Sequence, residues 1–104
     1  LALQYFQAGA DFFPEKWQFF FNIGLLKEEL NQYAEALEYY QKAEALMPDF
    51  QPITLNIGNV YFKLERYDEA KAIYEKILKT SNNPDAAYNL SLIHKLQKQK
   101  NENR

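Results

Sequence analysis

Three asparagines recur in this sequence at nearly equal intervals, and their side chains can form several hydrogen bonds. They are Asn22, Asn56 and Asn89, and each comes directly before a large aliphatic residue. An amide side chain offers one acceptor and two donors, so it can bond the N–H and the C=O of a passing backbone without reading its side chains. We therefore predict that the three amides bind a peptide. Hydrogen bonding to a neighbouring helix is the alternative.

The side chains that could support catalysis do not form a site in the sequence. His94 is the single histidine and falls where the matching segment has a tyrosine, so we predict a partly buried structural residue. A lone imidazole without partners is a weak candidate for a base or a metal ligand. Glu28 and Glu29 would point about 100° apart on a helix and do not make a paired acid. Ser81 is expected in a loop and Ser91 stands where the other units have the seam glycine, so neither is a credible nucleophile and we expect no enzymatic activity.

Composition excludes several other functions. The chain has 104 residues, 47% of them apolar, and a formal net charge of -2, with charges of both signs interspersed. A nucleic-acid surface is therefore not expected. There is no cysteine, which excludes disulfides, thiol catalysis and Cys-ligated metals. We expect no cofactor and no metal, and a cytoplasmic location, although the absence of cysteine also suits a bacterial periplasm.

Hydropathy along the chain predicts no membrane insertion, because no run of about 18 apolar residues exists. The chain opens at Leu1 within the pattern of a helix whose preceding partner is missing. We therefore expect a piece of a longer protein.

The three asparagines belong to a longer internal repeat. Residues 55–74 read as two helices joined by a tight turn, with apolar residues recurring every three or four positions in each. Aligned so that Asn56 falls on Asn22, this stretch matches an earlier one at Asn22, Ile23, Gly24, Leu30, Tyr33, Glu35, Ala36, Tyr40 and Lys42. A constant offset of this size is typical of helical arrays in which each helix pair buries its apolar face by stacking on its neighbours. Gly58 lies beside the seam of one pair, where a missing side chain permits close approach of the second helix.

The sequence resembles the tetratricopeptide repeat family. The family pattern is met in the first full unit by Phe20, Ile23, Gly24, Tyr33, Ala36, Tyr40, Ala43 and Pro48, and in the second by Ile57, Gly58, Tyr61, Tyr67, Ala70 and Tyr74. The sequence departs from the pattern at Lys27, Thr54, Ile77 and Asn82. The resemblance implies an all-α, right-handed superhelical solenoid of six helices in antiparallel pairs. It also implies structural roles for Gly24, Gly58, Ala36, Ala70, Tyr40, Tyr74 and Pro48.

The units of this array follow from the repeat register. We expect a half repeat at residues 1–16, full repeats at 17–50 and 51–84, and a terminal helix at 85–96. The tail at 97–104 has no apolar residue and is expected to fray.

In this family the first helix of each unit lines a concave groove, so the resemblance implies that peptide contacts lie there. Besides the three asparagines, which resemble the asparagine ladders of some members, the predicted contacts are Phe21, Leu25, Leu55, Asn59, Phe62, Tyr88 and Leu92. For the apolar members, packing between adjacent helices is the alternative.

The family's carboxylate clamp, which grips a C-terminal carboxylate with Lys and Arg, is not matched. Of the corresponding residues Phe21, Leu25, Asn56, Asp85 and Asn89, only Asn56 fits. The aspartate would repel a carboxylate ligand.

These observations together predict a protein-interaction scaffold that holds an extended peptide or a helix of a partner protein in the concave groove. One alternative is a substrate-docking or targeting arm of a larger enzyme such as a glycosyltransferase. Another is weak self-association through the open N-terminal end, where Leu1, Leu3, Phe6 and Phe13 should be partly uncovered.

Overall fold

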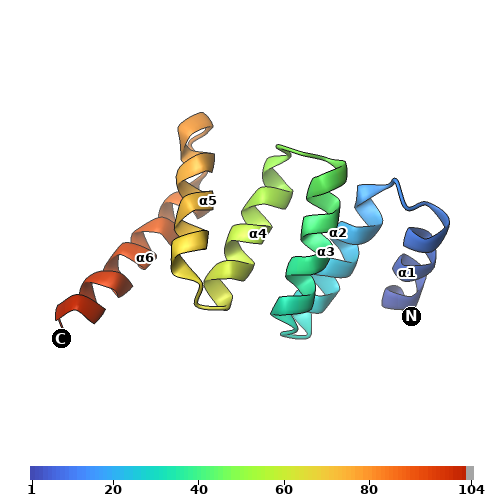
Figure 1. Ribbon diagram of the computed structural model, residues 1–104, viewed down its shortest axis with the longest axis horizontal. Helices are drawn as coiled ribbons and strands as arrows, with labels where there is room; N and C mark the ends of the chain where they lie inside the picture. Colours follow the sequence, from blue (N-terminus) through green and yellow to red (C-terminus); the bar gives the residue numbers. More distant parts are fainter. Residues whose placement is uncertain (103–104) are drawn as a thin grey trace.

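The computed structural model describes residues 1–102 as six helices in a row. They are α1 (Ala2–Phe12), α2 (Trp17–Glu29), α3 (Tyr33–Leu46), α4 (Gln51–Lys63), α5 (Tyr67–Thr80) and α6 (Pro84–Glu102). No strand occurs in that range, so the predicted all-α array of six helices is confirmed. Figure 1 shows the helices in chain order along the longest axis of a body that measures 51 × 29 × 18 Å, with the two termini at opposite ends.

Each helix packs on the one that follows it in the chain, from α1 on α2 to α5 on α6. In Figure 1, α3 lies in front of α2 and α5 lies in front of α6, so the two helix types form two layers. The helices α2, α4 and α6 form the layer that carries the predicted peptide contacts.

The turns inside both full repeats use a residue with a left-handed backbone. Asn31 and Glu65 each have φ near 60°. After Glu65, the Arg66 N–H donates a hydrogen bond to the Tyr61 carbonyl at 2.8 Å, which satisfies one of the free carbonyls at the end of α4. The equivalent bond at the end of α2 runs from the Gln32 N–H to the Lys27 carbonyl, also at 2.8 Å. Because both turns are built alike, the second helix of each pair leaves in the same direction.

The core lies in the seams between consecutive helices. Two clusters of buried residues comprise Ala36, Leu37, Tyr40, Ala43, Ile53, Ile57 and Val60 at the α2–α4 end, and Ala70, Tyr74, Ile77, Ala86 and Ile93 at the α5–α6 end. Four of the residues with predicted structural roles are fully buried: Ala36, Ala70, Tyr40 and Tyr74. Pro48 is exposed and follows Met47, the C-cap of α3.

The glycines of α2 and α4 lie where side chains of the following helices approach. A Cβ atom built at Gly24 would lie 2.5 Å from Cε1 of Tyr40, and one at Gly58 would lie 2.9 Å from Cγ2 of Ile73. Gly9 of α1, which the repeat pattern did not single out, is covered in the same way by the ring of Phe19. The absence of a side chain therefore sets the distance between helices at three seams.

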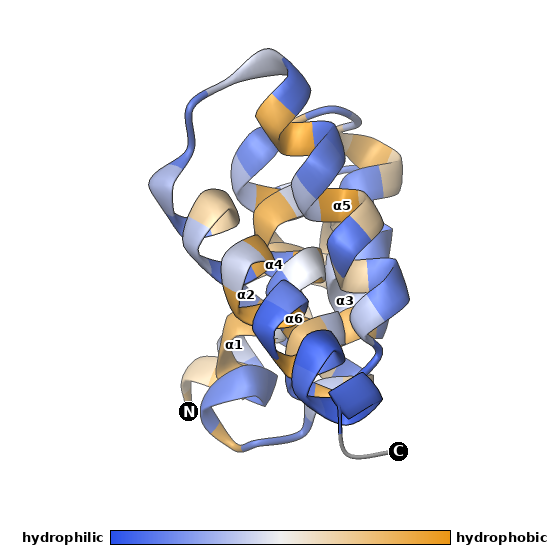
Figure 2. Cartoon of the chain, turned by 90° about the vertical axis from the view of Figure 1, so that its left-hand side faces the viewer, coloured by the Kyte–Doolittle hydropathy of each residue, from blue (hydrophilic) through white to orange (hydrophobic). Residues whose placement is uncertain are grey.

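Two expectations about α6 are corrected. The helix does not end near Leu96 but continues to Glu102, because Lys, Gln and Glu are good helix formers and no Gly or Pro interrupts them. Figure 2, in which α6 is nearest the viewer, shows how hydrophilic this last part is. Asn103 and Arg104, at the end of the predicted fraying tail, lie outside the described residues.

The second correction concerns His94, which is exposed and not partly buried. Its predecessor Ile93 is fully buried and takes the inward position of this turn of α6. The tyrosine in the matching segment, Tyr61, is partly buried because it packs against both clusters of buried residues.

Candidate functional site

The predicted apolar contacts remain accessible to different degrees. Leu25 of α2 is 37% exposed and Tyr88 of α6 is 65% exposed. The other apolar members are partly buried: Phe21, Leu55, Phe62 and Leu92. The ring of Phe21 lies 5.7 Å from that of Tyr40, and the ring of Phe62 lies 5.5 Å from that of Tyr67. Phe21 and Phe62 therefore combine core packing with partial exposure, while Leu25 and Tyr88 are accessible.

A closed hydrogen-bond network joins α4, α5 and α6. The Tyr74 hydroxyl donates to Oδ1 of Asn59 at 2.6 Å. Nδ2 of Asn89 donates to the same oxygen at 3.0 Å and to the Tyr74 hydroxyl oxygen at 3.3 Å. Burial raises the pKa of Tyr74 to about 12, and the bond from Asn89 opposes that rise. The Asn59 oxygen, the Asn89 amide nitrogen and the Tyr74 hydroxyl are thus bonded to one another.

A related but more open network joins α2, α3 and α4. The Tyr40 hydroxyl donates to Oε1 of Glu28 at 2.7 Å. Burial raises the pKa of Tyr40 well above its usual range, the Glu28 bond and charge raise it further, and the nearby Asn56 amide lowers it. Glu28 is partly exposed, and in the described part of the chain its carboxylate has no cationic partner.

The three repeated asparagines thus have unequal surroundings. Asn89 is held by Tyr74 and Asn59, Asn56 lies near the Tyr40 hydroxyl, and all three are partly buried. These contacts agree with the alternative in which the amides bond neighbouring helices, most clearly at Asn89. Peptide binding by Asn22, Asn56 and Asn89 remains a prediction.

Glu28 is a site residue that sequence reasoning missed. The sequence alone offers it only as half of a paired acid with Glu29. The signal lay in the repeat register, because Leu25 stands where the next unit has Asn59. A leucine cannot accept a hydrogen bond, so the Tyr40 hydroxyl bonds to the carboxylate one turn further along α2.

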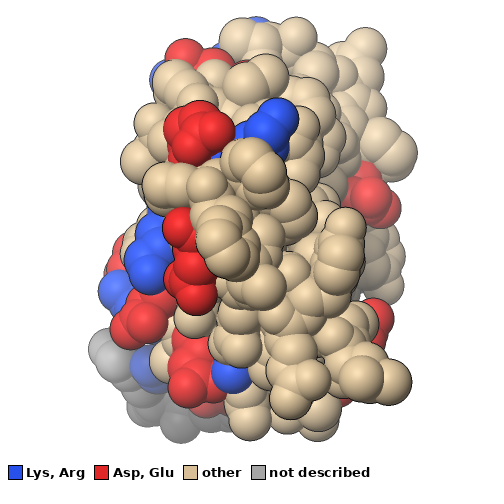
Figure 3. Space-filling model, turned by 90° about the vertical axis from the view of Figure 1, so that its right-hand side faces the viewer, with Lys and Arg blue, Asp and Glu red and all other residues tan. Residues whose placement is uncertain are grey.

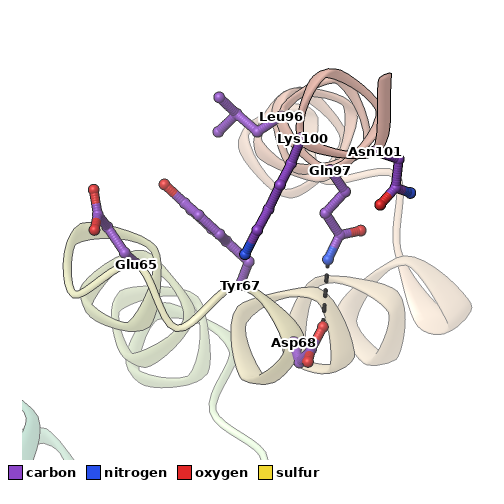
Figure 4. Close-up of a pocket in the computed structure, with 7 residues that line it drawn as sticks. All are labelled: Glu65, Tyr67, Asp68, Leu96, Gln97, Lys100 and Asn101. Carbon is purple, nitrogen blue, oxygen red and sulfur yellow. Dashed lines mark hydrogen bonds between the residues drawn. The ribbon is translucent and has the colours of Figure 1, made fainter. Parts of the chain in front are cut away.

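A cavity of about 520 Å³ lies between the start of α5 and the end of α6, and none of the predicted peptide contacts lines it. Its lining residues are Glu65, Tyr67, Asp68, Leu96, Gln97, Lys100 and Asn101. Figure 4 shows Gln97 reaching from α6 toward Asp68 of α5, to which its amide donates a hydrogen bond at 3.3 Å. The sequence does not predict this cavity, because Gln97, Lys100 and Asn101 belong to the tail that is expected to fray.

Residues 1–102 contain neither a cluster of metal ligands nor a membrane-spanning helix. No group of three or more His, Cys, Asp or Glu side chains is placed to hold a metal ion. None of the six helices has both the length and the hydropathy to cross a membrane.

Comparison with solved structures finds helical repeat domains. The first TPR of Spaghetti (RPAP3) bound to the HSP90 peptide SRMEEVD superposes with a TM-score of 0.85 at 25% identity, over 91% of this chain and 76% of that one. The TPR protein YrrB, described as having an unusual peptide-binding site, gives 0.76 at 31% identity, over 91% of this chain and 50% of that one.

A third structure, the second TPR domain of human RPAP3 with the HSP70 peptide SGPTIEEVD, gives a TM-score of 0.80 at 20% identity, over 88% of this chain and 78% of that one. Comparison with curated protein sequences finds no significant match. Two family models described as tetratricopeptide repeat match residues 28–98 and residues 1–49. Since the first of these covers more than half of the sequence, the chain belongs to the tetratricopeptide repeat family.

Proposed function

We propose that this chain is a protein-interaction module that binds an extended peptide or a helix of a partner protein along α2, α4 and α6. The observation that carries the proposal is the exposure of Leu25 and Tyr88 on two of these helices. Phe21, Leu55, Phe62 and Leu92 supply partly exposed apolar area between them. One similar structure is a complex with a peptide and another is described as having a peptide-binding site, which supports a peptide as the kind of ligand.

A matched pair of leucines allows a direct test. Leu25 is 37% exposed on α2 and Leu46 is 40% exposed on α3, so aspartate should be tolerated equally well at both. A library of nonapeptides displayed with both ends fused would first be selected on the unmodified chain. We expect Leu25→Asp to lower the affinity of selected peptides by about tenfold or more, since it places a charge in an apolar contact. Leu46→Asp should leave the affinity unchanged.

Two outcomes would refute the proposal. One is the absence of any enriched peptide. The other is equal loss of binding in Leu25→Asp and Leu46→Asp at equal stability, which would place the binding surface elsewhere. The melting temperatures of both variants serve as the folding control.

We also propose a second function, weak self-association of the chain through α1. Leu1, Tyr5, Phe12 and Phe13 are exposed at this end, while Leu3 and Phe6 are partly buried. Figure 3, in which this end faces the viewer, shows a broad area without charged side chains. Contiguous exposed apolar surface favours association. Sedimentation at about 1 mM, where even weak complexes are populated, should show a dimer that Phe12→Asp abolishes, and a monomer at that concentration would refute the proposal.

A further inference from the structure

The two ends of the proposed binding surface differ in the charge of the group that accepts a hydrogen bond from the buried tyrosine. At the α4–α6 end, Asn59, Tyr74 and Asn89 bond one another. At the α2 end, Oε1 of Glu28 takes the Tyr40 hydroxyl, and no cation in the described part of the chain pairs with the carboxylate. The negative charge at the α2 end is therefore available to a ligand.

The Glu28 carboxylate is held in a fixed position. Tyr40 is fully buried, its ring lies against Gly24 and packs on Phe21, and its hydroxyl reaches Oε1 of Glu28 at 2.7 Å. Glu28 itself is partly buried, so its charge is less screened than that of a free surface glutamate. A partly desolvated carboxylate in a set position gains most from a cation that brings further hydrogen bonds.

The lysines of α2, α3 and α4 contact other groups. Lys27 of α2 pairs with Glu35 at 3.2 Å. Nζ of Lys42 on α3 lies 5.0 Å from the ring centre of Tyr39, and Nζ of Lys63 on α4 lies 5.5 Å from that of Tyr33. None of the predicted apolar and amide contacts is a lysine or an arginine. Among the described residues, the α2 end therefore presents a negative charge and no free cation, so a ligand with acidic groups would be repelled there.

The surface beside Glu28 suits the stem of a long cationic side chain. Leu25 lies one turn before Glu28 on α2 and is 37% exposed. Lysine and arginine cover apolar surface with their methylene groups while the charged end contacts a polar group. A leucine one turn from a carboxylate offers both contacts to one side chain.

We propose that the α2 end of this surface binds a peptide segment through a lysine or arginine side chain, with the charged group on the Glu28 carboxylate and the stem on Leu25. The inference rests on the proposed function and adds the charge of the ligand. It predicts that segments rich in Glu and Asp, such as those named for the two RPAP3 structures, bind poorly here.

The test uses the same displayed nonapeptide library, in which no peptide has a free C-terminal carboxylate. Selection on the unmodified chain should enrich Lys or Arg at one peptide position. A selected peptide and its Gln counterpart at that position, both synthesised with blocked ends, should differ in affinity by about tenfold, as expected for a partly desolvated charge pair. The difference should fall below about twofold in Glu28→Gln, which keeps an oxygen acceptor for Tyr40 but removes the charge.

The control is Glu38→Gln, an exposed site on α3, which should keep the tenfold difference. Peptides enriched without a basic position would overturn this inference and leave the proposed function standing. A basic preference that persists unchanged in Glu28→Gln would overturn it as well. No enrichment at all would refute the proposed function and, with it, the inference.

Discussion

Replacing Gly24 with alanine tests the packing of the first full repeat, because two opposing effects can be separated there. Alanine is favoured over glycine in a helix interior by about 1 kcal/mol. Against this, the new Cβ would lie 2.5 Å from Cε1 and 2.6 Å from Cδ1 of Tyr40, where ordinary contacts between carbon atoms are about 3.5 to 4.0 Å. The ring would have to move by about 1 Å.

Tyr40 cannot make that movement freely. Its side chain is fully buried, its ring packs on Phe21 and its hydroxyl is bound to Glu28. Overpacking of a filled core costs about 1 to 3 kcal/mol, and a ring that must move by about 1 Å places Gly24→Ala in the upper part of that range, at about 2 to 3 kcal/mol. After the gain of about 1 kcal/mol in helix propensity, we expect the variant to have a free energy of unfolding lower by about 1 to 2 kcal/mol.

Gly58 is the matched comparison. A Cβ there would lie 2.9 Å from Cγ2 of Ile73 and 3.0 Å from Cε1 of Tyr74. Ile73 is partly buried and its methyl group can shift by a few tenths of an ångström, so Gly58→Ala should change stability by less than about 0.5 kcal/mol. The bulkier Gly58→Leu should exceed this space and cost about 1 to 3 kcal/mol or more.

Urea unfolding of the variants measures these differences. Ala72→Gly, at an exposed site within α5, gives the propensity difference in this protein without a packing change. A Gly24→Ala variant as stable as the unmodified chain would refute the reasoning about Tyr40, and so would a Gly58→Ala variant that loses more stability than Gly24→Ala.

Three further predictions concern hydrogen bonds, a turn and pH. Asn89→Ala should lower the free energy of unfolding in urea by about 1 to 3 kcal/mol, because it removes the amide that donates hydrogen bonds to Tyr74 and Asn59. An equal loss in Asn22→Ala would contradict the conclusion that the asparagines have unequal surroundings. Glu65→Gly should raise the unfolding free energy by about 0.5 to 1 kcal/mol, because glycine adopts φ near 60° without strain, and a lower melting temperature would argue against that. Tyr74 has a folded pKa of about 12 against about 10 when unfolded, so its contribution is intact below pH 10 and lost as pH rises from about 10 to 12. The unfolding free energy should be lower at about pH 12 than at about pH 9, and Tyr40, whose pKa is also raised by burial, adds to that loss. Tyr74→Phe should reduce the difference by roughly 2 to 3 kcal/mol, and an unchanged difference in this variant would contradict the share assigned to Tyr74.

The fold was predictable because its determinants are local and occur twice. Ala36 and Ala70 are fully buried, and Gly24 and Gly58 contact the side chains of the following helices. Small residues at fixed spacing specify how closely helices approach, and the constant repeat period specifies which helices pair. The tail differs from the prediction because the absence of apolar residues does not by itself end a helix. Lys, Gln and Glu carry enough helix propensity to extend an existing helix, since each added residue gains one backbone hydrogen bond after nucleation.

The candidate site was less predictable, because a hydrogen bond depends on both partners. Asn22, Asn56 and Asn89 look equivalent in the sequence. Only Asn89 has both an asparagine and a tyrosine within hydrogen-bond distance among the residues that the structure describes. The repeat period places each amide correctly on its helix but does not specify what the neighbouring helix presents to it.

Differences between repeats therefore carry more information about ligands than the residues that the repeats share. Tyr40 and Tyr74 are shared, fully buried and needed in every unit to fill the seam. What varies is the acceptor for their hydroxyls, a neutral amide at Asn59 and a charged carboxylate at Glu28. Exchanging asparagine for leucine at position 25 removes one acceptor, and the tyrosine then bonds to a charged group beside an exposed apolar side chain. A repeat can thus keep its core and acquire a charge at its surface through a difference at one position.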